Sequence, residues 1–315
     1  MFKAKKVLVS AMAPALLATT GIQSSTAAPK NQARAVVQAD WLEQNVDNPK
    51  VRIIEVSTEP GIYERGHIKN AAKIVWHTDL VDTVNRDIAS AKNFQKLAQK
   101  IGINKDTTIV LYGDKNNWFA AWGAWLFNIY GATDVRILDG GRVKWEKDGR
   151  ALTTAVPAFK AGNFTTRVAD KSLRATLLQD VLPVAKKRVK ADLIDIRGAD
   201  EFSGKIFAAP GFQELAVRAG HIPGAINVPW GQNVNADGTF KTVAELKKLY
   251  ADKGVDGKQN IITYCRIGER SSLTWFVLSE ILGYNVKNYD GSWTEYGNSV
   301  GAPINNPAGT VWGAQ

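Results

Sequence analysis

The chain of 315 residues holds a single cysteine, Cys265, in a setting that favours a reactive thiol. It directly follows a short run rich in β-branched residues, 260–264, and precedes Arg266, Gly268 and Arg270. A buried strand, a turn and a helix in this order form a concave site whose backbone N–H groups hold negative charge. We therefore expect the pKa of the thiol to lie below its ordinary value of about 8.5. Such a thiolate is nucleophilic without a separate general base.

The loop around Cys265 belongs to the second copy of an internal repeat with a period of about 150 residues. Gly-His-Ile, an alanine and a closing tryptophan recur at the same spacing in two segments, and two further pairs of segments match in the same order. The three pairs are 66–76 with 220–230, 101–114 with 253–266, and 131–141 with 282–292. Matches in the same order indicate a repeat. The repeat predicts two domains, at 31–150 and 176–315, joined by a linker at 151–175 that lacks clear periodicity.

Each copy alternates strands with helices. Short apolar runs at 52–56, 107–112, 192–196 and 260–264 are typical of buried strands. Asp40 with Glu43, and Thr176 with Gln179, have the spacing of capping boxes. The pattern predicts an α/β fold with a parallel sheet in each copy, and Cys265 at the carboxyl end of a strand, where such sheets bind ligands.

Two later helices are expected to have one apolar face each. The apolar positions are Phe119, Trp122, Leu126 and Ile129 in the first copy, and Leu273, Phe276, Val277 and Ile281 in the second. The helix after the cysteine is expected to begin near Ser271 or Ser272. Trp76 and Trp230 match across the repeat, which favours packing in the core over a binding surface.

The amino terminus has the pattern of a signal peptide at 1–28. Three lysines within the first six residues precede a mostly apolar run at 7–17, and small residues at 25–28 place the cleavage near Ala27 or Ala28. We therefore expect a periplasmic or secreted protein that leaves the membrane after cleavage. Exported proteins usually spend cysteines on disulfides, so a lone thiol there calls for a chemical role.

The formal net charge of +10 falls to +7 without the three lysines of that segment. This surplus favours small anionic partners, and because it is scattered along the chain it does not predict a nucleic-acid partner. No cluster of histidine and cysteine has metal-ligand spacing. His67 and His221 occupy equivalent positions of the two copies, so we expect them to fix turns.

Residues from about 35 to 300 resemble tandem-domain rhodaneses, the thiosulfate and 3-mercaptopyruvate sulfurtransferases. The resemblance rests on the segments 195–197, 220–225, 264–271 and 290–293. It implies two three-layer rhodanese-like domains, each a small parallel sheet flanked by helices, with an inactive first copy and a catalytic second copy. It also implies a persulfide on Cys265 that passes sulfur from a small anionic donor to a thiol or to cyanide. We expect a monomer without a cofactor.

The resemblance implies a set of site residues. Cys265 is the expected catalytic residue, and the expected substrate-binding residues are Arg197, Arg266, Ile267, Gly268, Glu269, Arg270 and Ser271. The equivalent loop of the first copy reads Tyr112-Gly113-Asp114, without a nucleophile. An arginine after the cysteine favours thiosulfate as the donor, because the 3-mercaptopyruvate pattern Cys-Gly-Ser-Gly-Val-Thr lacks it.

Alternatives of other classes stay open. Cysteine-dependent phosphatases use a Cys-x5-Arg loop, whereas Cys265 and Arg270 are separated by only four residues. The shorter loop fits a single sulfur atom better than a phosphate group. A non-catalytic sulfur carrier would need the thiol only as an attachment point. Measured turnover distinguishes these possibilities.

Overall fold

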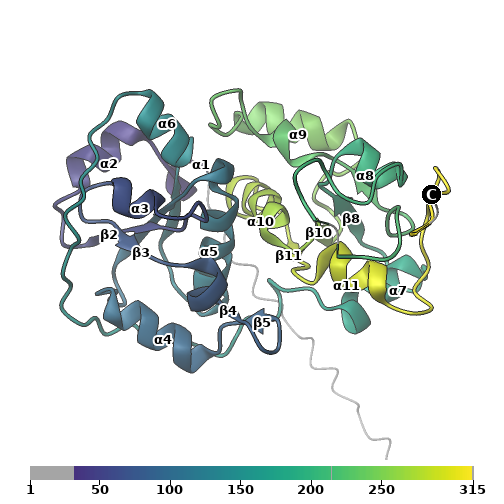
Figure 1. The fold of residues 1–315 in the computed structure, drawn as a ribbon, viewed down its shortest axis with the longest axis horizontal. Coiled ribbons are helices and arrows are strands. Elements are labelled where there is room, and N and C mark those ends of the chain that lie inside the picture. Colours follow the sequence, from purple (N-terminus) through teal and green to yellow (C-terminus); the bar gives the residue numbers. More distant parts are fainter. Residues whose placement is uncertain (1–31, 214, 314–315) are drawn as a thin grey trace, which may run out of the picture.

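The structure, a computed structural model, describes residues 32–213 and 215–313 (Figure 1). The predicted signal peptide lies outside the described residues. Two α/β domains follow one another along the chain, the first coloured purple to teal and the second teal to yellow. Both have parallel sheets flanked by helices, which confirms the predicted fold class. Within the described part, no helix combines the length and the apolar character needed to cross a bilayer.

The first domain is built on a five-stranded parallel sheet in the order β1-β7-β6-β2-β3. The strands are β1 (Val36–Val37), β2 (Val51–Glu55), β3 (Ala72–Lys73), β6 (Thr108–Tyr112) and β7 (Val135–Leu138). One sheet face packs against α4 and α5, and the other against α2 and α6. The helices are α1 (Gln32–Ala35), α2 (Ala39–Asn45), α3 (Ile62–Arg65), α4 (Ala91–Lys100), α5 (Trp118–Ile129) and α6 (Gly141–Lys147), with short helical turns at Trp76–Leu80 and Lys115–Asn117.

A two-stranded antiparallel hairpin extends from the first domain toward the second. It consists of β4 (Val81–Asp82) and β5 (Asp87–Ile88). The carboxylate of Asp82 accepts hydrogen bonds from the backbone N–H groups of Val84 and Asn85, which orders the turn.

The second domain repeats this plan with four parallel strands in the order β11-β10-β8-β9. The strands are β8 (Asp192–Asp195), β9 (Ile226–Asn227), β10 (Ile261–Tyr264) and β11 (Val286–Asn288). Helices α9 and α10 cover one face, and α7 with α11 the other. The helices are α7 (Leu182–Ala185), α8 (Ala199–Ser203), α9 (Val243–Ala251), α10 (Glu269–Phe276) and α11 (Ser292–Asn298), with helical turns at Leu177–Val181, Trp230–Asn233 and Val277–Ile281.

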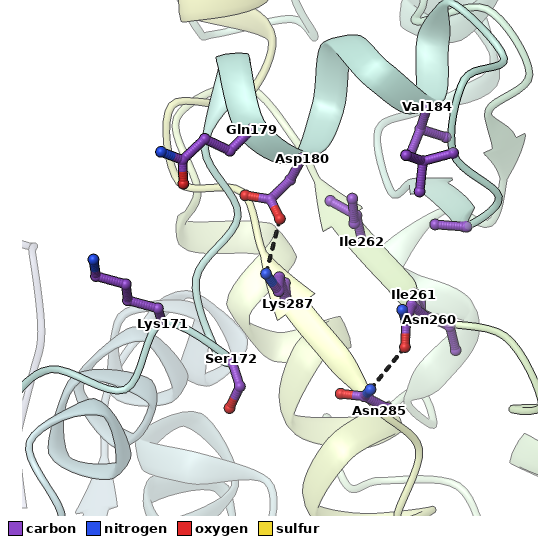
Figure 2. A pocket seen from close by; sticks show the side chains of 12 residues that line it. Lys171, Ser172, Gln179, Asp180, Val184, Asn260, Ile261, Ile262, Asn285 and Lys287 are labelled. Atoms are coloured by element: carbon purple, nitrogen blue, oxygen red, sulfur yellow. Dashed lines mark hydrogen bonds and ion pairs between the residues drawn. The ribbon is translucent and has the colours of Figure 1, made fainter. Parts of the chain in front are cut away.

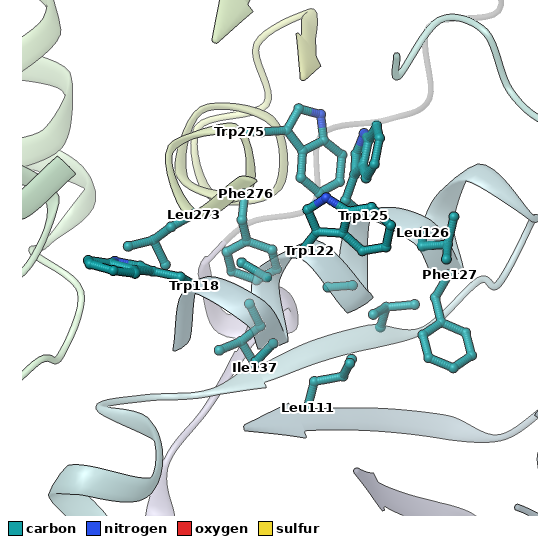
Figure 3. Packing of buried hydrophobic residues seen from close by; sticks show 14 of the residues in the cluster. Leu111, Trp118, Trp122, Trp125, Leu126, Phe127, Ile137, Leu273, Trp275 and Phe276 are labelled. Carbon is teal, nitrogen blue, oxygen red and sulfur yellow. The ribbon is translucent and has the colours of Figure 1, made fainter. Parts of the chain in front are cut away.

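Helices α5 and α10 follow equivalent strands of the two copies and pack against each other between the domains (Figure 3). Trp122 and Trp125 of α5 lie beside Trp275 and Phe276 of α10, all four fully buried. The prediction of a single apolar face on α5 is therefore wrong, because the second domain covers the side that would otherwise face water.

The two tryptophans that match across the repeat differ in burial. Trp76 is buried in the first domain, as expected. Trp230 is half-buried and meets the ring of Trp118, at the start of α5, edge to face at 4.8 Å. The packing of Trp230 therefore joins the two domains.

Both predicted capping boxes are wrong. Helix α2 begins one residue before Asp40, which places that side chain inside the first turn, where it pairs with Arg150. At the second position the helical turn does begin after Thr176, but the N–H of Thr176 donates to the carboxylate of Asp180 and not to Gln179.

Residues 151–175 contain no helix or strand longer than an isolated bridge. They are nevertheless attached to the first domain, because the N–H of Phe164 donates to the carbonyl of Ile103 and the N–H of Arg167 to that of Tyr130. Phe164 is buried against Phe94 of α4. The linker is thus an extended strap over the first domain.

Candidate functional site

Cys265 lies directly after Tyr264 at the carboxyl end of β10 and has no exposed surface. Its backbone N–H donates to the hydroxyl of Ser292 at 3.1 Å, and its carbonyl accepts from the N–H of Trp293 at 3.0 Å. The first residues of α11 therefore hold the backbone from which the thiol projects.

Polar groups from the following turn surround the sulfur. The N–H of Gly268 donates to Cys265 Sγ at 3.1 Å, and the thiol in turn donates to Glu269 Oε2 at 3.6 Å. The hydroxyl of Ser292 lies 4.0 Å from the same sulfur. Backbone and side-chain hydrogen bonds from Ser271 also favour negative charge on the sulfur. The strand, turn and helix thus present donors to one sulfur atom.

The expected depression of the thiol pKa is wrong for this closed arrangement. Burial raises the pKa of the Cys265 thiol above its ordinary value, and the nearby Glu269 carboxylate raises it further. Arg270 and the hydrogen bonds from Ser271 act in the opposite direction without outweighing these effects. The physical reason is desolvation, since removing water destabilises a thiolate more than the loop donors stabilise it. Burial in this site therefore favours the protonated thiol over the thiolate.

The two arginines of the loop have different partners. Arg270 is buried and forms a two-pronged ion pair with Glu201 of α8, at 3.2 and 3.3 Å. Arg266 is half-buried and donates to the backbone carbonyl of Gln213 at 2.8 Å. Both guanidinium groups lie over the ring of Phe212, at 5.6 and 5.8 Å from its centre. Of the two arginines, Arg270 is therefore the one whose positive charge lowers the pKa of the Cys265 thiol, and Arg266 lies farther from the sulfur.

The other loop residues mainly shape the turn. The hydroxyl of Ser271 lies within hydrogen-bond distance of the carbonyl oxygen of Gly268, at 3.0 Å, and of Asn288 Oδ1, at 2.6 Å, and Ser271 has no exposed surface. The carbonyl of Ile267 accepts a hydrogen bond from Arg86 of the first domain. Helix α10 begins at Glu269, two residues before the expected start at Ser271.

Arg197 follows the carboxyl end of β8, and its side chain is buried among partners within the second domain. It is only 1% exposed, pairs with Asp195 at 2.7 Å, and donates to the carbonyl of Gly220 at 2.7 Å. Its guanidinium also lies 4.6 Å from the ring centre of Trp293. Internal partners thus hold the charge of Arg197 between β8 and α11, and its predicted role in substrate binding stays a prediction.

Ser292 is a residue of the candidate site that the sequence reasoning missed, because its hydroxyl contacts the backbone of Cys265. Its backbone φ of +52° lies in the left-handed region, which a residue with a side chain rarely adopts. The equivalent residue of the first copy is Gly141, with φ +58°. In the second copy the strained backbone of Ser292 therefore places its hydroxyl where it accepts the hydrogen bond from the N–H of Cys265. The signal was available, because serine replaces glycine at this point of the repeat.

The equivalent loop of the first domain has neither the nucleophile nor the space for it. A Cβ atom at Gly113 would lie 2.2 Å from the backbone carbonyl oxygen of Val56. The carboxylate of Asp114 accepts hydrogen bonds from the N–H groups of Thr58 and Glu59. This loop is therefore closed onto its own domain.

The equivalent histidines have equivalent structural roles. His67 stacks on Tyr63 at 3.8 Å and His221 on Phe202 at 3.7 Å, and each Nδ1 bonds to the carbonyl of its stacking partner. Such contacts fix the turns that carry them. Over the residues that the structure describes, no three His, Cys, Asp or Glu side chains gather as a metal site.

A separate cavity of about 330 Å³ lies near the amino ends of β10 and β11, away from Cys265 (Figure 2). Two pairs of its polar side chains bond to each other, Lys287 to Asp180 at 2.8 Å and Asn285 to Asn260 at 2.7 Å. The thiol of Cys265 does not line this cavity, so the loop after β10 is the candidate active site.

Comparison with known proteins agrees with the geometry. The family model of the rhodanese-like domain matches residues 38–148 and 180–299. A protein of Mycolicibacterium smegmatis named "Putative thiosulfate sulfurtransferase" is 51% identical over 271 residues, which cover 85% of this chain and 96% of that protein.

Two further matches extend the comparison. The "Sulfur carrier protein TtuD" of Thermus thermophilus is 48% identical over 274 residues, covering 85% of this chain and 95% of that protein. The crystal structure of SseA from Escherichia coli, described as a 3-mercaptopyruvate sulfotransferase with a rhodanese fold, matches with a TM-score of 0.70 at 28% identity. That match covers 82% of this chain and 98% of the other.

Proposed function

Because this chain belongs to the rhodanese family of sulfurtransferases, we propose that Cys265 takes the sulfane sulfur of thiosulfate and passes it to a thiol or to cyanide. The observation that carries the proposal is the thiol at the end of β10 with the Gly268 N–H directed at its sulfur at 3.1 Å. The names of relatives such as the Mycolicibacterium protein support thiosulfate as the donor. Arg266, directly after the cysteine, supports a dianionic donor as well.

The first half-reaction transfers sulfur to the enzyme. The thiol proton passes to the Glu269 carboxylate, which already accepts the S–H hydrogen bond. Cys265 Sγ then attacks the outer sulfur of thiosulfate, the S–S bond of the donor breaks, and sulfite leaves with the electron pair. A protonated Glu269 no longer repels the dianion. The product is a persulfide on Cys265.

The second half-reaction returns the enzyme to its starting state. A thiolate or cyanide attacks the terminal sulfur, and the S–S bond of the persulfide breaks with the electron pair returning to Sγ. The N–H groups of the turn stabilise this developing thiolate, as oxyanion donors do in acyl transfer. Sγ then recovers the proton from Glu269.

Alternative functions would require different properties of the same loop. 3-Mercaptopyruvate carries one carboxylate, and its use in place of thiosulfate would make the outer arginine dispensable. A pure sulfur carrier, as the name of the Thermus relative suggests, would discharge its persulfide to a partner protein and not to a small thiol. A phosphatase would hydrolyse aryl phosphates, and we expect no such hydrolysis.

We further infer that the mature protein acts outside the cytoplasm as a monomer, without cofactor or nucleic acid. The lysine-initiated apolar run and the small residues before position 29 support export. Fractionation followed by amino-terminal sequencing tests this inference. A mature protein that retains residues 1–28 in the cytoplasm contradicts it.

Substitution of the nucleophile tests the proposed function. In Cys265→Ser a hydroxyl replaces the thiol and cannot hold sulfane sulfur, so we expect a folded protein with no thiocyanate formation from thiosulfate and cyanide. Intact mass gives an independent readout, since wild-type protein treated with thiosulfate should gain one sulfur atom that a reductant removes. Thiocyanate formation by the serine variant at the wild-type rate would refute the proposal.

A further inference from the structure

The first domain reaches the catalytic loop through the turn of its β4–β5 hairpin. Arg86 Nη2 donates to the carbonyl of Ile267 at 2.7 Å and to the carbonyl of Asp290 at 3.2 Å. Arg86 Nη1 also lies 3.5 Å from the carboxylate of Asp290. A residue of the inactive domain thus bonds directly to the loop that holds the nucleophile.

The carbonyl that Arg86 contacts belongs to the same peptide unit as the N–H that contacts the sulfur. In a planar trans peptide the C=O of Ile267 and the N–H of Gly268 point in opposite directions. Arg86 holds the oxygen end, and the nitrogen end donates to Cys265 Sγ at 3.1 Å. A positive charge on the carbonyl also polarises the peptide and strengthens its N–H as a donor.

We propose that Arg86 is a positioning residue of the active site, supplied by the inactive domain, which holds the Ile267–Gly268 peptide with its N–H directed at the sulfur of Cys265. The expected effect of Arg86 on sulfur transfer rests on the proposed function. Its expected effect on the pKa of the Cys265 thiol does not.

The repeat within the chain supports this assignment. Arg86 stands two residues before Ile88, which pairs with Val81 in the hairpin, and Gly238 stands two residues before Phe240, which pairs with Val234 in the second copy. Arg86 has φ +53° and Gly238 has φ +82°.

Glycine therefore occupies this left-handed position in the copy whose turn faces the inactive loop, near Gly140. In the first copy an arginine adopts the same conformation, which is strained for a residue with a side chain. Strain of this kind persists where the surrounding structure and function require it. Here it directs a guanidinium at the catalytic loop.

A second arginine provides a matched control. Arg174 also pairs with Asp290, at 3.1 Å, and with Asp87 of the hairpin at 2.7 Å. It therefore shares the ionic contacts between the domains with Arg86, whereas the hydrogen bond to the carbonyl of Ile267 comes from Arg86. Loss of Arg174 weakens the hairpin contact without removing the bond to the peptide.

Other charges face the sulfur and stay in place when Arg86 is changed. Glu269 and Arg270 come from α10, and Glu201 from α8 holds Arg270. Arg266 lies farther out, on the carbonyl of Gln213. A changed pH profile in an Arg86 variant can therefore be assigned to the peptide and to Arg86 itself.

The experiment compares Arg86→Ala, Arg86→Lys and Arg174→Ala in the full chain, with thermal unfolding to confirm the fold. Alkylation of Cys265 by iodoacetamide is measured as a function of pH, because it reports on the thiol whether or not sulfur transfer occurs. For Arg86→Ala we expect the pH midpoint to rise and the rate near neutral pH to fall roughly threefold to fivefold. Lysine, which can donate to the carbonyl, should restore part of this loss.

Sulfur transfer provides the second readout. Arg86→Ala should lower kcat for thiocyanate formation by about tenfold or more, as expected when a donor shifts by a fraction of an ångström, with a smaller change in KM. Arg174→Ala should leave the alkylation midpoint near that of wild type. An unchanged alkylation profile in Arg86→Ala, or an equal shift in Arg174→Ala, would overturn the proposal, and the alkylation result holds even if thiosulfate is not the donor.

Discussion

Gly268→Ala tests whether the geometry of the turn controls sulfur transfer. Gly268 has φ +98°, and a Cβ atom there would lie 2.5 Å from the Cα of Asp290 and 2.8 Å from its carbonyl oxygen. Asp290 is held by ion pairs with Arg86 and Arg174, so a shift of its backbone would break these contacts. The catalytic turn must therefore move instead.

The size of that movement follows from the contact. Ordinary van der Waals contact begins at 3.4 Å, so the Cβ must retreat by about 0.9 Å, and the Gly268 N–H, now 3.1 Å from the sulfur, moves with it. Misplacement by about 1 Å costs on the order of a hundredfold in rate. The strained φ and the overlap together should lower the free energy of unfolding by about 2–5 kcal/mol.

Two glycines serve as controls for the separate effects. Gly224 has φ +82° with open space around it, so Gly224→Ala introduces backbone strain alone, worth about 1–2 kcal/mol. Gly231 has open space and no left-handed φ, so Gly231→Ala introduces neither effect. Both controls should retain thiocyanate formation close to that of wild type.

The assay is kcat/KM for thiocyanate formation, with urea unfolding measured on each variant. We expect a loss of about a hundredfold for Gly268→Ala, and less than threefold for the controls. If Gly268→Ala folds and keeps activity within about threefold of wild type, or if Gly224→Ala loses as much, the argument from the turn geometry is wrong.

Substitutions at two further positions examine the neighbours of the sulfur. Glu269→Gln removes a carboxylate that raises the pKa of the Cys265 thiol, so the pH profile of alkylation should shift to lower pH. Sulfur transfer should slow, because an amide cannot take the thiol proton. Sulfur transfer as fast as in wild type would exclude the role in proton transfer, and an unshifted alkylation profile would exclude the electrostatic effect. Ser292→Ala leaves the buried N–H of Cys265 without its acceptor and should lower the free energy of unfolding by about 1–3 kcal/mol in urea titrations. Ser292→Gly should lose less, since it relieves the backbone at φ +52°; equal stability of all three proteins would show that the hydroxyl contributes nothing.

The sequence by itself indicated the candidate nucleophile and the class of fold that carries it. A lone cysteine after a strand and before a glycine-containing turn indicated the nucleophile, and the repeat indicated two α/β copies of which one lacks it. These features are local, because strand and helix periodicity and turn residues act over a few neighbours along the chain. The parallel sheets and the position of Cys265 at a strand end followed from the same patterns.

The state of the thiol required the tertiary structure. Arginines near in sequence indicated a lowered pKa, but complete burial and the Glu269 carboxylate raise it. The sign of a pKa shift depends on the balance of desolvation and neighbouring charge, and burial results from the whole fold. For the same reason Arg197, adjacent to the site in the motif, turned out to pair internally with Asp195.

Contacts between the domains also depended on the tertiary structure. Helix α5 is apolar nearly all round, which indicates a helix buried on every side, but its sequence does not identify α10 as the partner. Nothing around Arg86 indicates that it meets the carbonyl of Ile267, 181 residues away. Such pairings depend on how two complete domains meet, which no short window of sequence encodes. The sequence alone therefore predicted which atom reacts, whereas the packing of the domains decided which groups surround that atom.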